Sequence, residues 1–149
     1  MQNKFNKESI IVSACLLGIN CKYNGGNNHN PQMDRVLKQY HVIPVCPEQL
    51  GGLRTPRPPA EIKNNKVVRQ NGEDVTAYFE KGAQETLGIA ILFSVKTAIL
   101  KDKSPSCGKN FIYNGNFEEQ LIKGEGITTS LLLENNIRIV SENELCKIS

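Results

Sequence analysis

Five cysteines are the residues of this 149-residue chain with the clearest capacity for chemistry. They are Cys15, Cys21, Cys46, Cys107 and Cys146. Their number is odd and they lie far apart, whereas disulfide scaffolds are usually shorter chains with a denser set of cysteines. We therefore expect reduced thiols in a cytoplasmic protein, where cysteines more often bind a metal or take part in catalysis.

Three of these cysteines are expected where buried strands end. Cys15 ends the first apolar run of the chain, Cys46 follows the second, and Cys107 lies in the loop after the third. In open α/β sheets, ligands bind in the crevice outside the carboxyl ends of the strands. Any one of the three could be a small buried core residue, but their equivalent positions predict one shared site.

The chemistry of sulfur limits what such a site would bind. Thiolates select zinc, copper(I) or iron–sulfur clusters. A structural zinc site takes four ligands, often from paired Cys-x-x-Cys motifs, and the sequence contains no such motif. Three thiolates that leave one coordination position unfilled favour an iron–sulfur cluster with one open iron, which would act as a Lewis acid.

The remaining cysteines and the two histidines are weaker candidates. The spacing of Cys21 from Cys15 is not typical of zinc or cluster sites. Cys21 could be a fourth ligand or a resolving thiol, but we favour a buried loop residue. Cys146 lies in a polar tail and is expected to be structural. His29 could approach the site from an Asn-rich loop, whereas His41 opens a strand and is expected to be structural.

Polar residues next to the cysteines could supply acid–base chemistry. Glu48, two residues after Cys46, is a candidate general base, although a carboxylate at a helix start is an equal alternative. Ser104 and Ser106 flank Pro105 and could hold a substrate or a sulfide through hydroxyl hydrogen bonds, or could simply cap the loop. Glu48 and the two serines are the predicted catalytic residues.

Basic residues near the predicted site have two interpretations. Arg54 and Arg57 lie in a proline-rich segment and could bind an anion. For Arg57 we favour an ion pair with Glu61 that braces the loop. Lys101 and Lys103, next to the Ser-Pro-Ser-Cys turn, could lower the pKa of a thiol, but lysines at a strand end are usually solvated.

Alternating strand and helix signals must position these residues. Apolar or β-branched runs predict core strands at 9–15, 41–45, 96–100 and 137–140. Capping and apolar spacing predict three helices. The first begins at Asn30-Pro31 and has Met33, Val36, Leu37 and Tyr40 on one face. The second runs from a Thr76 cap to Ile91, and the third covers 128–133. Turn signals predict hairpins at 61–75 around Gln70-Asn71-Gly72 and at 111–117 around Asn114-Gly115.

These signals predict an α/β fold. Core strands separated by helices favour an open, mostly parallel sheet of about four core strands, with helices on both faces and right-handed crossovers. We expect this Rossmann-like arrangement, with its small hairpins, to form a single domain over 1–149, since a domain typically takes about 100–200 residues.

Composition narrows the classes of protein. With 39% hydrophobic and 22% charged residues, the chain is neither disordered nor membrane-spanning. A net charge of +3 is too small to argue for nucleic acid or an anionic membrane. Residues 12–15 resemble a lipoprotein cleavage site, but the preceding apolar stretch is far below the roughly 7–15 residues of an export signal. We expect a cytoplasmic protein with neither a membrane nor duplex nucleic acid as partner.

Four motifs carry a resemblance to a known family. They are Ser13-Ala-Cys-Leu-Leu-Gly18 followed by Cys21-Lys-Tyr-Asn-Gly25, then Pro44-Val-Cys-Pro-Glu48, then Pro56-Arg-Pro-Pro-Ala-Glu61, and then Lys103-Ser-Pro-Ser-Cys-Gly108. In this order they resemble a bacterial family, long catalogued as a domain of unknown function, that includes the iron–sulfur-dependent thiouracil desulfurases. The resemblance spans most of the chain.

The resemblance implies a site and a reaction. Cys15, Cys46 and Cys107 would hold a [4Fe–4S] cluster, which is oxygen-sensitive and easily lost in air. The fourth iron would bind the sulfur of a thiolated base such as thiouracil, and water would displace it as hydrosulfide without net redox change. Family members often have Arg-Tyr-Asp at 22–24, where this chain has Lys-Tyr-Asn, so no carboxylate role is carried over there.

Two other functions stay open at this stage. Cys46 or Cys107 could be a nucleophile that takes sulfur from a substrate as a persulfide. A non-enzymatic zinc-binding module would instead contain stoichiometric zinc and would lose its fold on chelation.

Overall fold

A four-stranded parallel sheet forms the centre of the structure, a computed structural model that describes residues 7–148. Its order is β2-β1-β5-β8. The strands are β1 (Ser9–Ser13), β2 (His41–Val45), β5 (Thr97–Leu100) and β8 (Arg138–Ser141). The predicted α/β fold with four core strands is confirmed, and the structure adds their order.

Strand β1 lies inside the sheet because both of its faces are apolar. Ile10 and Val12 belong to one core layer and Ile11 to the opposite one, and all three are fully buried. A parallel strand buried on both faces is a continuous apolar run rather than an alternating one. The register pairs Ser13 with Val45, so the chain leaves β1 and β2 at the same edge of the sheet.

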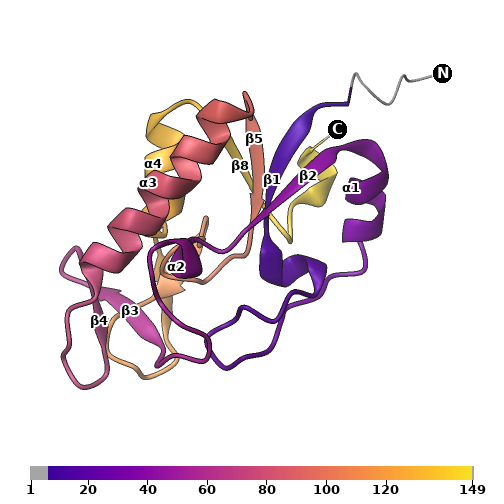
Figure 1. Ribbon diagram of the computed structural model, residues 1–149. Helices are drawn as coiled ribbons and strands as arrows, with labels where there is room; N and C mark the ends of the chain where they lie inside the picture. The colour runs from indigo at the N-terminus through magenta and orange to yellow at the C-terminus, as the bar shows by residue number, and fades with distance from the viewer. Residues whose placement is uncertain (1–6, 149) are drawn as a thin grey trace.

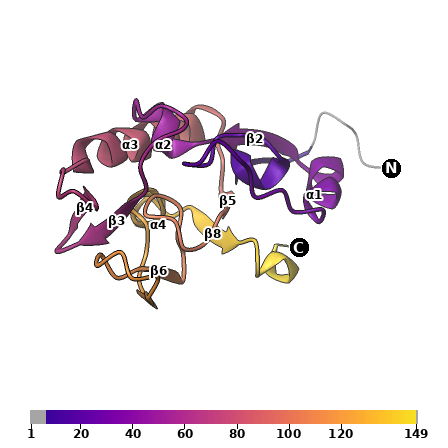
Figure 2. The ribbon, with the colours of Figure 1, turned by 90° about the horizontal axis from the view of Figure 1, so that it is seen from below.

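Helices cover both faces of this sheet, as predicted (Figures 1 and 2). Helices α3 (Thr76–Leu92) and α4 (Ile127–Glu134) pack with Ile11 on one face. Helix α1 (Met33–Gln39) and the short 3₁₀ helix η3 (Leu145–Lys147) cover the other face. The loops at the carboxyl ends of the strands are left open between these two layers.

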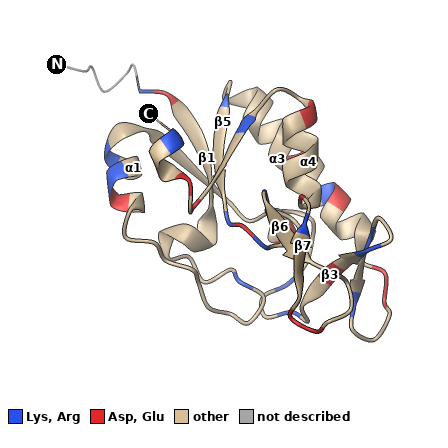
Figure 3. Ribbon diagram, turned by 180° about the vertical axis from the view of Figure 1, so that it is seen from behind, with Lys and Arg blue, Asp and Glu red and all other residues tan. Residues whose placement is uncertain are grey.

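Two antiparallel hairpins lie at the end of the molecule where the parallel strands finish (Figures 1 and 3). The strands are β3 (Ala60–Lys63) with β4 (Lys66–Arg69), and β6 (Phe111–Tyr113) with β7 (Leu121–Lys123). The Glu61 carboxylate joins the hairpins by accepting hydrogen bonds from the backbone N–H groups of Gly115, at 3.0 Å, and Phe117, at 3.2 Å. Together the hairpins form one wall beside the strand ends.

Helix α1 differs from its prediction in two respects. It begins at Met33 rather than at Pro31, because the Asn30 side chain accepts a hydrogen bond from the N–H of Gln32 in a turn before the helix. Leu37, expected on the buried face, is 49% exposed, whereas Val36 is buried as expected. The short helix presents a narrower apolar face to the sheet than its spacing predicts.

The hairpins also correct the prediction. The first hairpin turns at Asn64-Asn65, both at positive φ, a conformation that asparagine tolerates and that two-residue hairpin loops favour. The predicted turn at 70–72 is confirmed as a second turn after β4, because an antiparallel bridge joins Val68 to Asp74 across it. The partner of β6 is β7 at 121–123 rather than residues before 117. Thr76 begins α3 without capping it, because its hydroxyl accepts a hydrogen bond from the Val67 N–H.

Charged residues of both signs are spread over the elements (Figure 3). This distribution agrees with the small net charge of the chain. Among residues 7–148, no helix has the length and apolar character of a membrane span.

Candidate functional site

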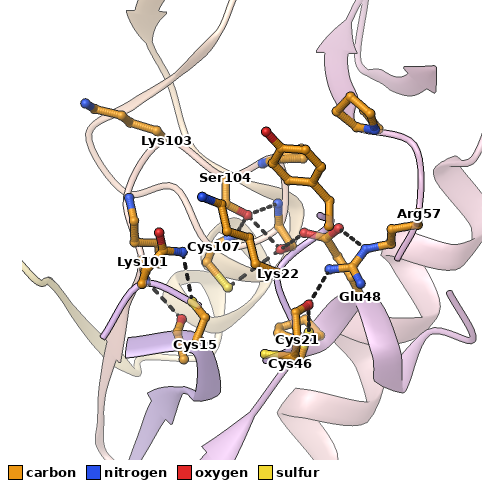
Figure 4. Close-up of a pocket in the computed structure, with 18 of the residues that line it drawn as sticks. Cys15, Cys21, Lys22, Cys46, Glu48, Arg57, Lys101, Lys103, Ser104 and Cys107 are labelled. Carbon is orange, nitrogen blue, oxygen red and sulfur yellow. Dashed lines mark hydrogen bonds and ion pairs between the residues drawn. The ribbon is translucent and has the colours of Figure 1, made fainter. Parts of the chain in front are cut away.

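Four cysteines surround one pocket at the carboxyl ends of the strands. The cavity has a volume of about 440 Å³, and its lining includes Cys15, Cys21, Cys46 and Cys107. Figure 4 shows these four side chains, which come from separate segments of the chain, around the same space. The structure therefore brings together the three cysteines predicted to share a site, whereas Cys146 is exposed and lies outside the pocket.

Cys15 lies in the 3₁₀ helix η2 (Ala14–Leu17), because β1 ends at Ser13, two residues earlier than predicted. The Asn28 side chain donates a hydrogen bond to Cys15 Sγ at 3.4 Å, and the Asn28 N–H donates to the Cys15 carbonyl at 2.9 Å. Burial raises the pKa of Cys15, and this effect exceeds the opposing effects of Asn28 and Lys101. The two hydrogen bonds from Asn28 thus hold both the backbone and the sulfur of Cys15, whose thiol faces the pocket.

Cys46 lies between β2 and the short helix α2 (Pro47–Leu50). Cys46 Sγ donates a hydrogen bond to the Cys21 carbonyl at 3.8 Å. The neighbouring Cys21 side chain lowers the pKa of Cys46 despite partial burial, and the Gln49 backbone N–H adds to this effect. The same interaction and burial raise the pKa of Cys21. Cys21 is 2% exposed, as expected for a buried loop residue, and it also lines the pocket beside Cys46.

Cys107 lies in the loop after β5 and is buried. Burial raises its pKa to about 12, and hydrogen bonds from Ser13 and Ser106 only partly offset that effect. The Ser104 hydroxyl accepts hydrogen bonds from the N–H groups of Ser106 and Cys107, at 3.0 and 3.1 Å. The Thr129 hydroxyl at the start of α4 donates to the Cys107 carbonyl at 2.9 Å. The loop is thus fixed from both sides.

Asp102, which was not among the residues singled out from the sequence, organises this loop. Its Oδ1 accepts hydrogen bonds from the backbone N–H groups of Lys103, Lys109, Asn110 and Phe111, at 2.9 to 3.2 Å. Burial opposes its ionisation, but these donors together lower the pKa of Asp102. A buried carboxylate that binds four backbone donors holds the loop in one conformation.

The three predicted catalytic residues form one hydrogen-bonded chain along the pocket (Figure 4). The Ser106 hydroxyl donates to Glu48 Oε2 at 3.0 Å, and the hydroxyls of Ser104 and Ser106 are 2.9 Å apart. The other carboxylate oxygen of Glu48 accepts a hydrogen bond from Arg57 Nε at 3.0 Å. This arrangement leaves Glu48 with a cation on one oxygen and a hydroxyl chain on the other.

Arg57 braces its loop as expected, but its partner is Glu48 rather than Glu61. The predicted pair does not form because Glu61 binds backbone N–H groups of the β6–β7 connection. The Arg57 side chain is only 3% exposed, and it also donates to the Cys21 carbonyl at 2.9 Å and the Thr55 hydroxyl at 2.9 Å. It connects the loop containing Cys21, the proline-rich segment and α2.

The predicted lysines and histidines have different environments. Lys101 lines the pocket and forms an ion pair with Glu142 at 3.0 Å. Lys103 also lines the pocket but is exposed. His29 lies against Gly18 outside the pocket, and His41 begins β2, at the amino end of the strand. Neither histidine is therefore placed to serve the cysteine site.

Several pocket residues have roles that the sequence did not indicate. Ser13 and Asn28 donate hydrogen bonds to thiols, and aromatic side chains of Tyr23, Tyr113 and Phe117 line the pocket. Ser13 lies at a strand end just before Cys15, so its position was a usable signal. The aromatic residues lie in loops and a hairpin whose approach to the pocket depends on tertiary packing.

The donor set fits a polynuclear iron–sulfur cluster. Among residues 7–148, no three His, Cys, Asp or Glu side chains are grouped tightly enough to hold one metal ion. Ligands of a single zinc ion all contact the same atom, at about 2.3 Å for sulfur. Cluster thiolates each bind a different iron and are spaced around the cluster. Cys15, Cys46 and Cys107 line one cavity of about 440 Å³ together with Cys21, and thiolates are the ligands that iron–sulfur clusters take.

Comparison with known proteins agrees with this geometry. The model of the 2-thiouracil desulfurase family matches residues 10–144. The uncharacterized protein YbbK of Bacillus subtilis (strain 168) is 42% identical over 146 residues, which covers 91% of this chain and 97% of YbbK. The structure is also similar to that of the [4Fe-4S]-dependent thiouracil desulfidase TudS, with a TM-score of 0.90, 45% identity and 95% of each chain covered. The chain belongs to the 2-thiouracil desulfurase family.

Proposed function

We propose that this chain is a [4Fe–4S]-dependent enzyme that removes sulfur from a thiolated pyrimidine such as thiouracil by hydrolysis. The observation that carries the proposal is the pocket in which three thiols lie beside the Glu48–Ser106–Ser104 chain. Family membership and the similarity to TudS support the same activity. The reaction replaces C=S by C=O with one water and releases hydrosulfide, so it needs no electron donor.

Cys15, Cys46 and Cys107 are the proposed cluster ligands. A cluster held by three thiolates supplies one iron with a free coordination position, a Lewis acid for the substrate sulfur. Cys15 and Cys107 have raised pKa values, so metal binding at these thiols must release protons. Thiols and such a cluster both persist in a reducing compartment, and we place the enzyme in the cytoplasm.

Glu48 is the proposed general base. Its Oε1 is fixed by Arg57, which leaves Oε2 and the Ser106 hydroxyl as the groups positioned to accept a proton from the attacking water. Hydrolysis requires that the water lose protons as the C–O bond forms, and a positioned carboxylate promotes this step. The Ser104 hydroxyl, 2.9 Å from that of Ser106, extends the chain toward the substrate or the departing sulfur.

Aromatic side chains are the proposed contacts for the base. Tyr23 comes from the loop after η2, whereas Tyr113 and Phe117 come from β6 and the connection that follows it. A planar pyrimidine presents two apolar faces, and aromatic rings pack against such faces in offset or edge-to-face geometries. We assign these residues to the substrate ring and the thiols with Glu48 to the reacting carbon–sulfur bond.

The test is metal content and turnover under anaerobic conditions. We expect iron and inorganic sulfide in the reconstituted protein, a broad visible absorption band, and hydrosulfide release from 2- or 4-thiouracil. Serine substitution of Cys15, Cys46 or Cys107 should reduce both iron content and turnover, while Cys146→Ser, in an exposed position, should change neither. A colourless protein without iron after reconstitution would contradict the proposal, and so would a ligand substitution that abolishes turnover but leaves iron content unchanged.

A further inference from the structure

Cys21 is a buried pocket thiol that the proposed reaction does not use. It is 2% exposed and lines the same cavity as Cys46. Cys46 Sγ also lies 3.8 Å from the Cys21 carbonyl oxygen. Figure 4 shows the two residues side by side at one edge of the pocket. A second cysteine therefore lies beside one proposed cluster ligand.

Arg57 holds the segments that contain Cys21 and Cys46 together. Arg57 donates a hydrogen bond to the Cys21 carbonyl at 2.9 Å, and the same guanidinium binds Glu48, two residues after Cys46. The Arg57 N–H also donates to the Tyr23 carbonyl at 2.8 Å. Both cysteine segments are thus fixed to one buried cation, and the contact of Cys46 Sγ with the Cys21 backbone is part of the packed structure.

The other two pocket thiols have different partners. Cys15 Sγ accepts a hydrogen bond from the Asn28 amide at 3.4 Å, and the Ser106 hydroxyl lies 3.6 Å from Cys107 Sγ. These donors cannot form a covalent bond with sulfur. Cys46 Sγ differs from these two thiols because its hydrogen-bond partner, at 3.8 Å, is the carbonyl oxygen of another cysteine, Cys21.

We propose that Cys21 and Cys46 form a disulfide when the site has lost its cluster, and that Cys21 thereby preserves a cluster ligand. The inference rests on the proposed function only for the statement that Cys46 binds iron. With the cluster bound, the Cys46 sulfur is engaged and the disulfide cannot form. Without it, Cys46 is the more accessible thiol of the pair, since Cys21 is buried, so Cys46 is oxidised first and Cys21 resolves the product.

The chemistry needs a peroxide as oxidant. The Cys46 thiol reacts with hydrogen peroxide to give a sulfenic acid and one water. The Cys21 thiol then attacks the sulfenic sulfur, which forms the S–S bond and releases a second water. The two thiols lose two electrons in total and the peroxide gains them. In the absence of a neighbouring thiol, a sulfenic acid can be oxidised further to a sulfinic acid, which thiol reductants do not reverse.

The test oxidises the anaerobically purified enzyme and then maps its cysteines. Iron content and hydrosulfide release are recorded first, so that failure of the proposed function is seen separately from the outcome for the disulfide. Hydrogen peroxide with a chelator then removes the iron, and free thiols are blocked with N-ethylmaleimide. Chymotrypsin is the suitable protease, because cleavage at Leu16 or Leu17 separates Cys15 from Cys21, whereas no lysine or arginine lies between them. We expect a peptide that joins Cys21 to Cys46.

Two variants make the result decisive. Cys21→Ser keeps a hydrogen-bond donor beside Cys46 and should load iron like the wild type before oxidation. After peroxide, dithiothreitol and reconstitution, the wild type and Cys146→Ser should regain most of their iron, while Cys21→Ser should regain severalfold less and carry sulfinic acid at Cys46. The proposal is wrong if another cysteine pair dominates the peptide map, or if Cys21→Ser recovers as fully as the wild type.

Discussion

Helices α2 and α3 cross with their backbones in contact, and this crossing positions the site. A Cβ atom added to Gly82 of α3 would overlap the Pro47 carbonyl group of α2, and one added to Gly51 would overlap the Tyr78 carbonyl group. Helix α2 follows Cys46 directly and carries Glu48 in its first turn. We therefore predict that Gly82→Ala both destabilises the protein and disturbs the site, whereas Gly88→Ala in the same helix does neither.

The expected change in the free energy of unfolding follows from two opposing effects. In a helix interior, alanine is about 1 kcal/mol more favourable than glycine. Gly88 has no atom within 4 Å of the added Cβ, so its substitution should gain that amount. At Gly82 the added atom meets a backbone carbonyl that cannot rotate away, and overpacking costs about 1–3 kcal/mol. With the upper end of that range, Gly82→Ala loses about 2 kcal/mol net, which is about 4–8 °C in Tm for a domain of this size.

Thermal unfolding followed by circular dichroism measures the stability of both variants. Gly88→Ala should raise Tm by about 2–4 °C, and Gly82→Ala should lower it and also reduce hydrosulfide release by displacing Glu48. An equal rise in Tm for the two variants would refute the reasoning, because it would mean that the backbones of α2 and α3 are not in contact at this crossing.

Three further predictions concern the polar network. Arg57→Met should lower the free energy of unfolding by about 3 kcal/mol, since it leaves Glu48, whose side chain is 16% exposed, without its cation. Arg54→Met, at an exposed position, should change it by about 0.5 kcal/mol or less, and similar urea midpoints for the two variants would be inconsistent with this ion pair. Ser106→Ala should keep its iron but lose at least about tenfold in kcat for hydrosulfide release, and unchanged turnover would remove the hydroxyl from the mechanism. Hydrogen bonds from lysine ammonium groups hold the pKa of Glu144 below its usual range. The extra stability of the wild type over Glu144→Gln should therefore be complete above the unfolded carboxyl pKa of about 4.3 and should fall at lower pH. A difference in urea stability that stays constant from pH 7 to pH 3 would contradict this.

The location of the site was predictable because it depends on topology. Parallel strands finish at one edge of a sheet, so any residue that follows such a strand is brought to that edge whatever the order of the strands. Cys46 follows β2 directly, and Cys15 and Cys107 lie within short loops after β1 and β5. The prediction tolerated an error of two residues at the end of β1, because Cys15 stays at the same edge in a 3₁₀ turn.

The partners within the site were less predictable because they depend on how separate loops pack. Glu61 is four residues from Arg57 in sequence, yet Arg57 binds Glu48 in another element. The hairpin turn at Asn64-Asn65 directs Glu61 toward the β6–β7 connection instead. The contact of Cys21 with Cys46 likewise follows from the path of a long polar loop, for which periodicity and spacing give no signal.

Proposed cluster ligands and proposed acid–base residues are neighbours in the sequence of this chain. Cys46 and Glu48 share the segment after β2, and Ser106 and Cys107 are adjacent in the loop after β5. The hydrogen bond from Ser106 to Glu48 joins these two segments, so two of the three proposed ligands, Cys46 and Cys107, lie in segments that carry the proposed proton-transfer chain. The proposed proton acceptor is therefore positioned by the same two segments that hold these ligands. A substitution that displaces either segment should impair iron binding and catalysis together, whereas loss of the Ser106 hydroxyl alone should impair catalysis and leave iron binding intact.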